Sequence, residues 1–184
     1  MPPTDAVPTR RSIRLPGYDY SQIGQYFITI CAYEMRYVFG KIENGAVLLN
    51  VIGRIGLDCW REIPEHFEHV ELDAFVIMPN HLHGILTIRR SHAIQSPRSM
   101  EDGHGCPVPL QPSLEHFQRP SVGAIPTIIR SYKQSVTYLA RRRLTRPSLA
   151  IWQSNYYERV LRDGKEFSEA SRYIFENPIK WQAL

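Results

Sequence analysis

The chain has 184 residues, of which 43% are hydrophobic and 22% are charged, and it carries a formal net charge of +4. This length suffices for one domain with its own core, and no apolar run is long enough to cross a membrane. The three cysteines, Cys31, Cys59 and Cys106, are odd in number and lack the spacing of a disulfide framework or a zinc site. We therefore expect a globular protein of a reducing compartment, the cytoplasm.

The charge is distributed unevenly along the chain. Between His116 and Tyr157 there are seven Lys or Arg residues and no Asp or Glu, whereas Ile52–Asp73 holds six acidic residues and two arginines. Such asymmetry is typical of a face that binds a polyanion. A solvated helix face explains a basic run as well, so charge alone decides nothing about function.

The first quarter of the chain predicts a basic arm, a strand and a small hairpin. Residues 1–24 are rich in Pro, Arg and Tyr and are expected to have little regular structure. The alternation of aromatic and β-branched residues in Gln25–Ala32 predicts a strand. Asn44-Gly45 favours a hairpin turn between Tyr37–Gly40 and Ala46–Leu49.

The next segment predicts an amphipathic helix. Asn50 is a suitable N-cap, and apolar residues recur with a period near 3.6 over Val51–Glu65. Pro64 is expected to fray the last turn of this helix. Two strands, Val70–Met78 and His81–Ile88, should then pair around a turn at Pro79-Asn80.

The amino-acid composition changes at the start of the second half of the chain. Ser91–Pro120 holds prolines, glycines and few large apolar residues, and is interpreted as a flexible insertion. A long basic helix follows over Ser121–Leu144, starting properly near Pro126. Tyr157–Leu161 is a candidate strand, and the pattern after it predicts a final helix over Lys165–Asn177 that Pro178 ends.

This order of elements contains two strand–helix–strand halves. It predicts an α+β fold, a ferredoxin-like split βαβ with a central antiparallel sheet. Residues 25–184 would form one domain, preceded by the arm at 1–24 and interrupted by the insertion at 91–120. Because this fold serves many unrelated functions, the function has to be inferred from a site.

The most specific local feature is the segment Met78-Pro79-Asn80-His81-Leu82-His83-Gly84. Side chains alternate between the two faces of a strand, so His81 and His83 project together and Leu82 points to the opposite side. Two imidazoles on one face can bind one divalent ion and leave positions open for water or a phosphate. Two unrelated histidines on a half-buried strand would show the same spacing.

The final helix offers a second pair. Tyr173 and Asn177 are four residues apart and therefore neighbours on one helix face, beside the apolar stripe. A phenol and an amide would point to the same place, one as a nucleophile and the other as a metal ligand. Alternatively, Tyr173 is a rim aromatic and Asn177 merely ends the helix.

Together these motifs resemble a family. The segment MPNHLHG is similar to the histidine–hydrophobic–histidine (HUH) motif of single-strand DNA nucleases and transposases. Trp152–Asp163, followed by Tyr-Ile-Phe-Glu-Asn-Pro at 173–178, resembles the REP-associated tyrosine transposases and related insertion-sequence transposases. Arg11–Tyr20 also looks characteristic, and the resemblance extends over nearly the whole chain except the insertion.

The resemblance implies an enzyme that cuts and rejoins single-stranded DNA with one catalytic tyrosine and a divalent metal, Mg²⁺ or Mn²⁺. By motif position, His81 and His83 would be metal ligands and Tyr173 the nucleophile that forms a 5′-phosphotyrosine. Asn177 falls where related transposases carry a glutamine ligand. The substrate would be single-stranded DNA near a hairpin, bound by a monomer or a homodimer in the bacterial cytoplasm and its nucleoid.

The basic residues are candidates for contacts to the phosphate backbone. On the long helix these are Arg130, Lys133, Arg141, Arg142 and Arg143, and in the arm they are Arg11 and Arg14. Two other functions remain open. One is a binding module that has lost catalysis, and the other is a zinc hydrolase that uses His81, His83 and water, for which no general-base carboxylate is evident.

Overall fold

A computed structural model of the chain describes residues 21–89 and 123–181. The predicted insertion at 91–120 and the arm, apart from its last four residues, lie outside these ranges. The elements follow in the order β1 (Gly24–Cys31), η1 (Tyr33–Met35), β2 (Gly40–Glu43), β3 (Ala46–Leu49), α1 (Val51–Arg61), α2 (Ile63–His66), β4 (Val70–Ile77), β5 (His81–Ile88), α3 (Ile125–Leu144), β6 (Tyr157–Leu161) and α4 (Gly164–Trp181).

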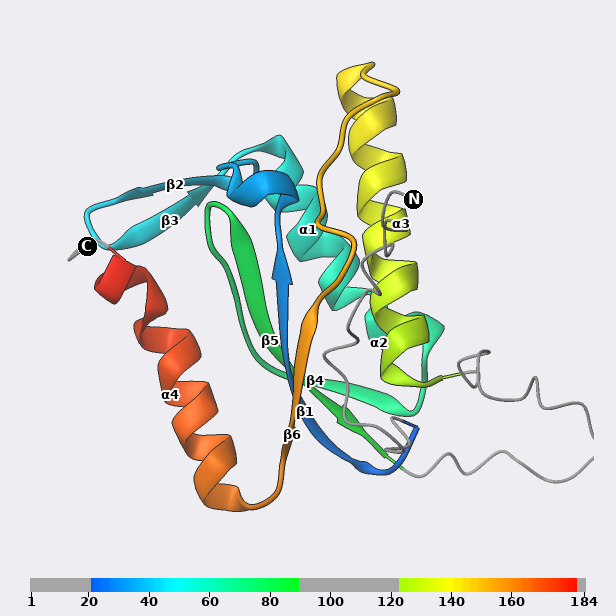
Figure 1. The fold of residues 1–184 in the computed structure, drawn as a ribbon, viewed down its shortest axis with the longest axis vertical. Coiled ribbons are helices and arrows are strands. Elements are labelled where there is room, and N and C mark those ends of the chain that lie inside the picture. Colours follow the sequence, from blue (N-terminus) through cyan, green and yellow to red (C-terminus); the bar gives the residue numbers. More distant parts are fainter. Residues whose placement is uncertain (1–20, 90–122, 182–184) are drawn as a thin grey trace, which may run out of the picture.

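Four strands form an antiparallel sheet in the order β4-β5-β1-β6, so β5 and β1 are the central strands. The segments β1-α1-β4 and β5-α3-β6 are the two split βαβ halves, which confirms the predicted ferredoxin-like α+β fold. Figure 1 shows α4 on one side of the sheet and α1 and α3 on the other. The β2–β3 hairpin forms a separate sheet.

Local signals explain several of these boundaries. The Asn50 side chain accepts a hydrogen bond from the Gly53 amide at 3.0 Å, as expected of an N-cap. Asn44 and Gly45 have φ angles of 51° and 75°. A two-residue hairpin turn of this type requires positive φ at both central positions, which explains the choice of Asn-Gly.

Three predicted boundaries are wrong. The first arm of the hairpin is Gly40–Glu43 rather than Tyr37–Gly40. The predicted helix over Val51–Glu65 is two helices, because Pro64 sits in the first turn of α2, where its missing N–H costs no hydrogen bond.

The third wrong boundary is the end of the last helix. Helix α4 continues through Pro178 to Trp181. A proline inside a helix removes one N–H and crowds the carbonyl four residues earlier, but here the last turn is held by ring contacts of Trp181 with Tyr37 at 6.2 Å and with His81 at 5.4 Å. Asn177 consequently lies inside the helix.

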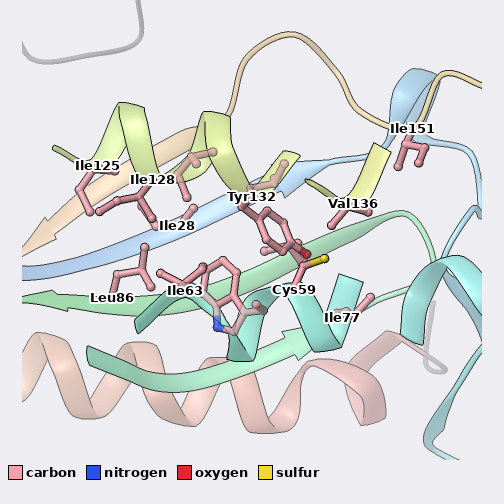
Figure 2. Packing of buried hydrophobic residues seen from close by; sticks show 14 of the residues in the cluster. Ile28, Cys59, Ile63, Ile77, Leu86, Ile125, Ile128, Tyr132, Val136 and Ile151 are labelled. Atoms are coloured by element: carbon pink, nitrogen blue, oxygen red, sulfur yellow. The ribbon is translucent and has the colours of Figure 1, made fainter. Parts of the chain in front are cut away.

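The main hydrophobic core lies between the sheet and the helices α1 and α3. Figure 2 shows Ile125, Ile128 and Tyr132 of α3 directed toward Ile28 and Leu86 of the sheet. A smaller cluster on the opposite face joins Ile85 and Leu161 to Ala170 and Ile174 of α4. The two faces of the sheet therefore carry cores of different size. In the described part of the chain, no helix has the length and apolarity that a membrane span requires.

Candidate active site between the sheet and helix α4

The two histidines open strand β5 and face α4. A tight turn precedes them, in which the Met78 amide donates to the His81 carbonyl at 2.8 Å. His81 and His83 are 8% and 6% exposed, and their ring centroids are 4.6 Å apart. The prediction that both imidazoles share one face of a central strand is confirmed.

A hydrogen bond to Nδ1 orients each imidazole. His81 Nδ1 lies 2.7 Å from the Asn80 side-chain oxygen, which can only accept, so Nδ1 carries the proton and the Nε2 lone pair is free. His83 Nδ1 lies 2.8 Å from the Thr29 hydroxyl of the neighbouring strand. Partners of this kind fix the tautomer and ring orientation of metal-binding histidines.

Burial keeps both imidazoles neutral. It lowers the pKa of His81 to about 4. Burial, together with the neighbouring His81, lowers the pKa of His83 to about 3. Metal binding requires neutral imidazole, so at pH 7 no proton has to be displaced.

Helix α4 brings Tyr173 to the histidine pair. Tyr173 Oη lies 3.5 Å from His83 Nε2, and the two ring centroids are 5.2 Å apart. Phe27 of β1 stacks on His83 at 5.3 Å and meets the Tyr173 ring at 6.1 Å. The tyrosine is 44% exposed and therefore accessible to a substrate.

Asn177 lies one turn further along α4 and is 7% exposed. Its side-chain amide forms no hydrogen bond with any residue that the structure describes, so its oxygen is available as a ligand. Within residues 21–89 and 123–181, no His, Cys, Asp or Glu joins the histidines in a set of three potential metal ligands.

This donor set fits a divalent metal. Two oriented, neutral imidazoles and a buried amide oxygen would hold the ion and leave positions for water and a phosphate oxygen. Mg²⁺ prefers sites made almost entirely of oxygen, so Mn²⁺ suits the nitrogen donors better.

The register of the edge strand β6 places Tyr156 and Tyr157 on opposite faces of the sheet. Tyr157 pairs with Thr29, which itself pairs with His83, so Tyr157 lies on the α4 face. Tyr156 lies on the opposite face, where its hydroxyl donates to Glu158 at 2.8 Å. Of these two alternatives to Tyr173, only Tyr157 shares the face of the histidines.

The predicted DNA-binding residues of α3 lie across the sheet from Tyr173. A groove of about 1160 Å³ runs between α3 and residues 145–156, and is called here the α3 groove. Its lining includes basic and aromatic side chains, namely Arg130, Lys133, Arg141, Arg142, Tyr138, Trp152 and Tyr156. Arg143 is exposed but does not line the groove, and Arg11 and Arg14 lie outside the described residues.

Not all of these cations are free to bind phosphate. Lys133 Nζ donates to the Gln153 carbonyl at 2.5 Å, and burial lowers the pKa of Lys133 to about 8. Arg141 Nε donates to the Leu149 carbonyl at 3.1 Å. Both side chains tie the following segment to α3, whereas Arg130 and Arg142 make no such bond to the described chain.

Several functional residues are absent from the sequence-based prediction. Asn80 and Thr29 orient the imidazoles, and Phe27 packs against both His83 and Tyr173. Gly84, which follows His83, serves packing rather than the site, because a Cβ there would lie 2.3 Å from the Trp60 ring on the main-core face. The alternation of strand Gln25–Ala32 could have placed Phe27 and Thr29 on one face, but not beside His83.

The comparisons with known proteins concern the family and the fold of the chain. No family model matches the chain. A Haemophilus influenzae protein described as uncharacterized is 42% identical over 177 residues, which cover 94% of this chain and 90% of that protein. The two proteins belong to one family.

Among solved structures, a REP-associated tyrosine transposase bound to a REP hairpin aligns with 93% of this chain and 74% of its own, with a TM-score of 0.57 and 15% identity. The chain has the fold of a REP-associated tyrosine transposase. A candidate transposase from Deinococcus radiodurans aligns with 91% of this chain and 98% of its own, with a TM-score of 0.45 and 16% identity. In this transposase fold, the histidines and Tyr173 lie on the α4 face and the α3 groove lies on the other.

Proposed function

We propose that the chain is a metal-dependent single-strand DNA endonuclease and transposase that cuts and rejoins strands through a phosphotyrosine. The observation that supports this proposal is the 3.5 Å approach of Tyr173 Oη to His83 Nε2. Tyr173, the candidate nucleophile, and His83, a candidate metal ligand, are 90 positions apart in the chain but lie together in one accessible site.

In the proposed reaction, Tyr173 Oη attacks the scissile phosphorus and forms an O–P bond, while the P–O3′ bond breaks. The phenol proton leaves to water, since Tyr173 is exposed, and the departing 3′ oxygen takes up a proton. The products are a 5′-phosphotyrosine and a free 3′-hydroxyl. Attack by a 3′-hydroxyl reverses the step and rejoins a strand without a nucleotide cofactor.

His81, His83 and Asn177 would hold the metal. A bound Mn²⁺ or Mg²⁺ supplies Lewis-acid stabilisation of the charge on the phosphate oxygens. The chain's own contribution is orientation: Asn80 and Thr29 hold the imidazoles, and Phe27 fixes the ring planes of His83 and Tyr173.

The proposed partner is single-stranded DNA beside a hairpin. The transposase of the same fold is described as bound to a REP hairpin. In this chain, the α3 groove combines arginines with the exposed ring of Tyr138, and such a combination binds phosphates and stacks on bases in single-strand binding proteins. We place its action in the bacterial cytoplasm, at the nucleoid.

A binding module without catalysis is the second candidate, and the α3 groove favours it because this groove does not depend on the histidines. The test is to incubate the protein with labelled hairpin-bearing single-stranded DNA and Mn²⁺, and to look for a denaturation-resistant protein–DNA adduct. We expect an adduct that EDTA or Tyr173→Phe abolishes and that Tyr33→Phe, at a tyrosine that does not line the α3 groove, leaves unchanged. Binding without any adduct would favour the second candidate.

A further inference from the structure

A pocket of about 540 Å³ opens beside Tyr173 and is called here the Tyr173 pocket. Phe27 and Thr29 of β1 and His83 of β5 form its floor, while α4 and β6 form its two walls. Its volume lies in the range of small-ligand sites. It adjoins the proposed reacting phosphate, so it would receive a nucleotide next to the cut.

The walls of the pocket present flat aromatic surfaces. Tyr157 from β6 and Tyr173 from α4 both line it, and they are 55% and 44% exposed. Phe27 adds a third ring at the floor, stacked on His83. Exposed aromatic rings are the surfaces on which unpaired bases stack.

Two opposite charges flank these rings. Arg159 pairs with Phe27 across the strands and so points to the same face, and Glu169 lies one turn before Tyr173 on α4. Neither side chain forms an ion pair or a hydrogen bond with any residue in the described part of the chain. Both are therefore available to a ligand.

The carboxylate identifies the kind of ligand. Glu169 would repel a phosphate, so in a pocket that receives DNA its carboxylate is suited to accept hydrogen bonds from donors on a base. The Watson–Crick edge of guanine offers two adjacent donors, N1–H and N2–H₂, which match the two oxygens of a carboxylate. The guanidinium of Arg159 matches the guanine acceptors O6 and N7.

We infer that the Tyr173 pocket binds an unpaired guanine next to the cleaved phosphate, read by Glu169 and Arg159 and stacked on Tyr157. This inference rests on the proposed function for the position of the phosphate. Glu169 is a specificity residue rather than a catalytic one. It contacts the base and not the reacting atoms.

Selection from a pool tests this inference without requiring cleavage. Full-length protein carrying Tyr173→Phe, which retains the ring, is incubated with hairpin-bearing oligonucleotides whose single-stranded flank is randomised, and the bound molecules are sequenced. We expect one flank position enriched in guanine. Adding Glu169→Gln should reduce that preference by roughly 5- to 100-fold, the range of one bidentate base contact.

The replacement should also remove the preference for guanine while binding of DNA persists. A carboxamide offers one donor and one acceptor, and each of the four bases presents such a pair on its Watson–Crick edge, so guanine should lose its advantage over the other bases at that position. A purely structural role of Glu169 would lower the affinity for all bases instead. The matched control is Glu68→Gln, at an exposed turn residue before β4, which should leave the base preference unchanged.

The outcomes separate this inference from the proposed function. If guanine enrichment depends on Glu169 but the wild-type protein forms no adduct, guanine recognition by the Tyr173 pocket is supported and the proposed endonuclease activity is contradicted. If the wild-type protein forms an adduct but guanine is not enriched, or if Glu169→Gln leaves the enrichment intact, guanine recognition by the Tyr173 pocket is contradicted and the proposed endonuclease activity is supported. Failure of the protein to bind any member of the pool overturns both.

Discussion

The two faces of the sheet are built from alternate residues of the same strands, yet they differ in composition. On β5, Leu82, Leu86 and Ile88 enter the main core with α1 and α3. His81 and His83, one position away, face α4 beside Tyr173, where the hydrophobic cluster is small. One face therefore supplies most of the stability, and the other is free to hold polar, reactive groups.

The largest expected contrast is between adjacent residues of β5. Leu82→Ala should lower the free energy of unfolding by about 2–5 kcal/mol, because it leaves a cavity in the main core, while the folded fraction still cleaves DNA. His83→Ala should reduce cleavage at least about 100-fold, equivalent to a loss of about 3 kcal/mol of transition-state stabilisation, with a smaller effect on stability. Urea unfolding and adduct formation measure the two effects, and a similar loss of cleavage in both variants would show that the two faces do not divide these roles.

The same contrast predicts a pH dependence that originates on the α4 face. The pKa values of His81 and His83 are lowered to about 4 and about 3 in the folded protein, whereas unfolded histidine titrates near 6.5. The unfolded state therefore binds more protons between these values, and the stability present above pH 6.5 is lost as the pH falls. We expect a loss of about 2 kcal/mol per histidine between pH 7 and pH 5.

This pH dependence is measured by urea unfolding in the presence of EDTA. His83→Gln should remove about half of the change between pH 7 and pH 5, because one of the two titrating groups is gone. An unaltered pH dependence in that variant would show that other groups are responsible.

A smaller effect concerns the hydrogen bond that orients His81. Asn80→Ala removes the acceptor of the Nδ1 proton and should weaken Mn²⁺ binding by about 10- to 100-fold, as the loss of such partners does in other metal sites. Titration calorimetry with Mn²⁺ measures the affinity. Asn155→Ala, in the exposed loop before β6, is the control, and equal effects of both changes would contradict the proposed orientation.

The smallest predicted effect lies on the opposite side, in the α3 groove. Arg130→Ala and Arg142→Ala should each weaken the binding of single-stranded DNA. In a plot of the logarithm of the binding constant against the logarithm of the salt concentration, the slope should become shallower by about one unit for each phosphate that is no longer neutralised. Arg54→Ala on α1 is the control. If both groove variants keep the affinity and slope of the wild type, the groove is not the binding face.

The fold could be predicted from the sequence because its main signals are local. Period-2 alternation defines which residues of β5 share a face, and Asn50 and Asn44-Gly45 specify their cap and turn through their own side chains and φ preferences. The helix boundary at Pro178 cannot be predicted in this way, because the contacts of Trp181 with His81 and Tyr37 come from distant segments.

The site was less predictable for the same reason. The pairing of Thr29 with His83 joins residues 54 positions apart, and the strand register that sets it cannot be read from either segment alone. Register also decides that Tyr157 faces the histidines while Tyr156 faces α3. Alternation within the segment does not tell which of these consecutive tyrosines faces the histidines.

The central claim is that Tyr173 is the residue that becomes linked to DNA, and mapping that link tests it most directly. The wild-type protein is incubated with hairpin-bearing single-stranded DNA and Mn²⁺, the bound DNA is trimmed by a nuclease, and the modified peptide is sequenced by mass spectrometry. We predict a nucleotide on Tyr173. A nucleotide on Tyr157, the other tyrosine of the Tyr173 pocket, or on Tyr156 across the sheet, would contradict this claim.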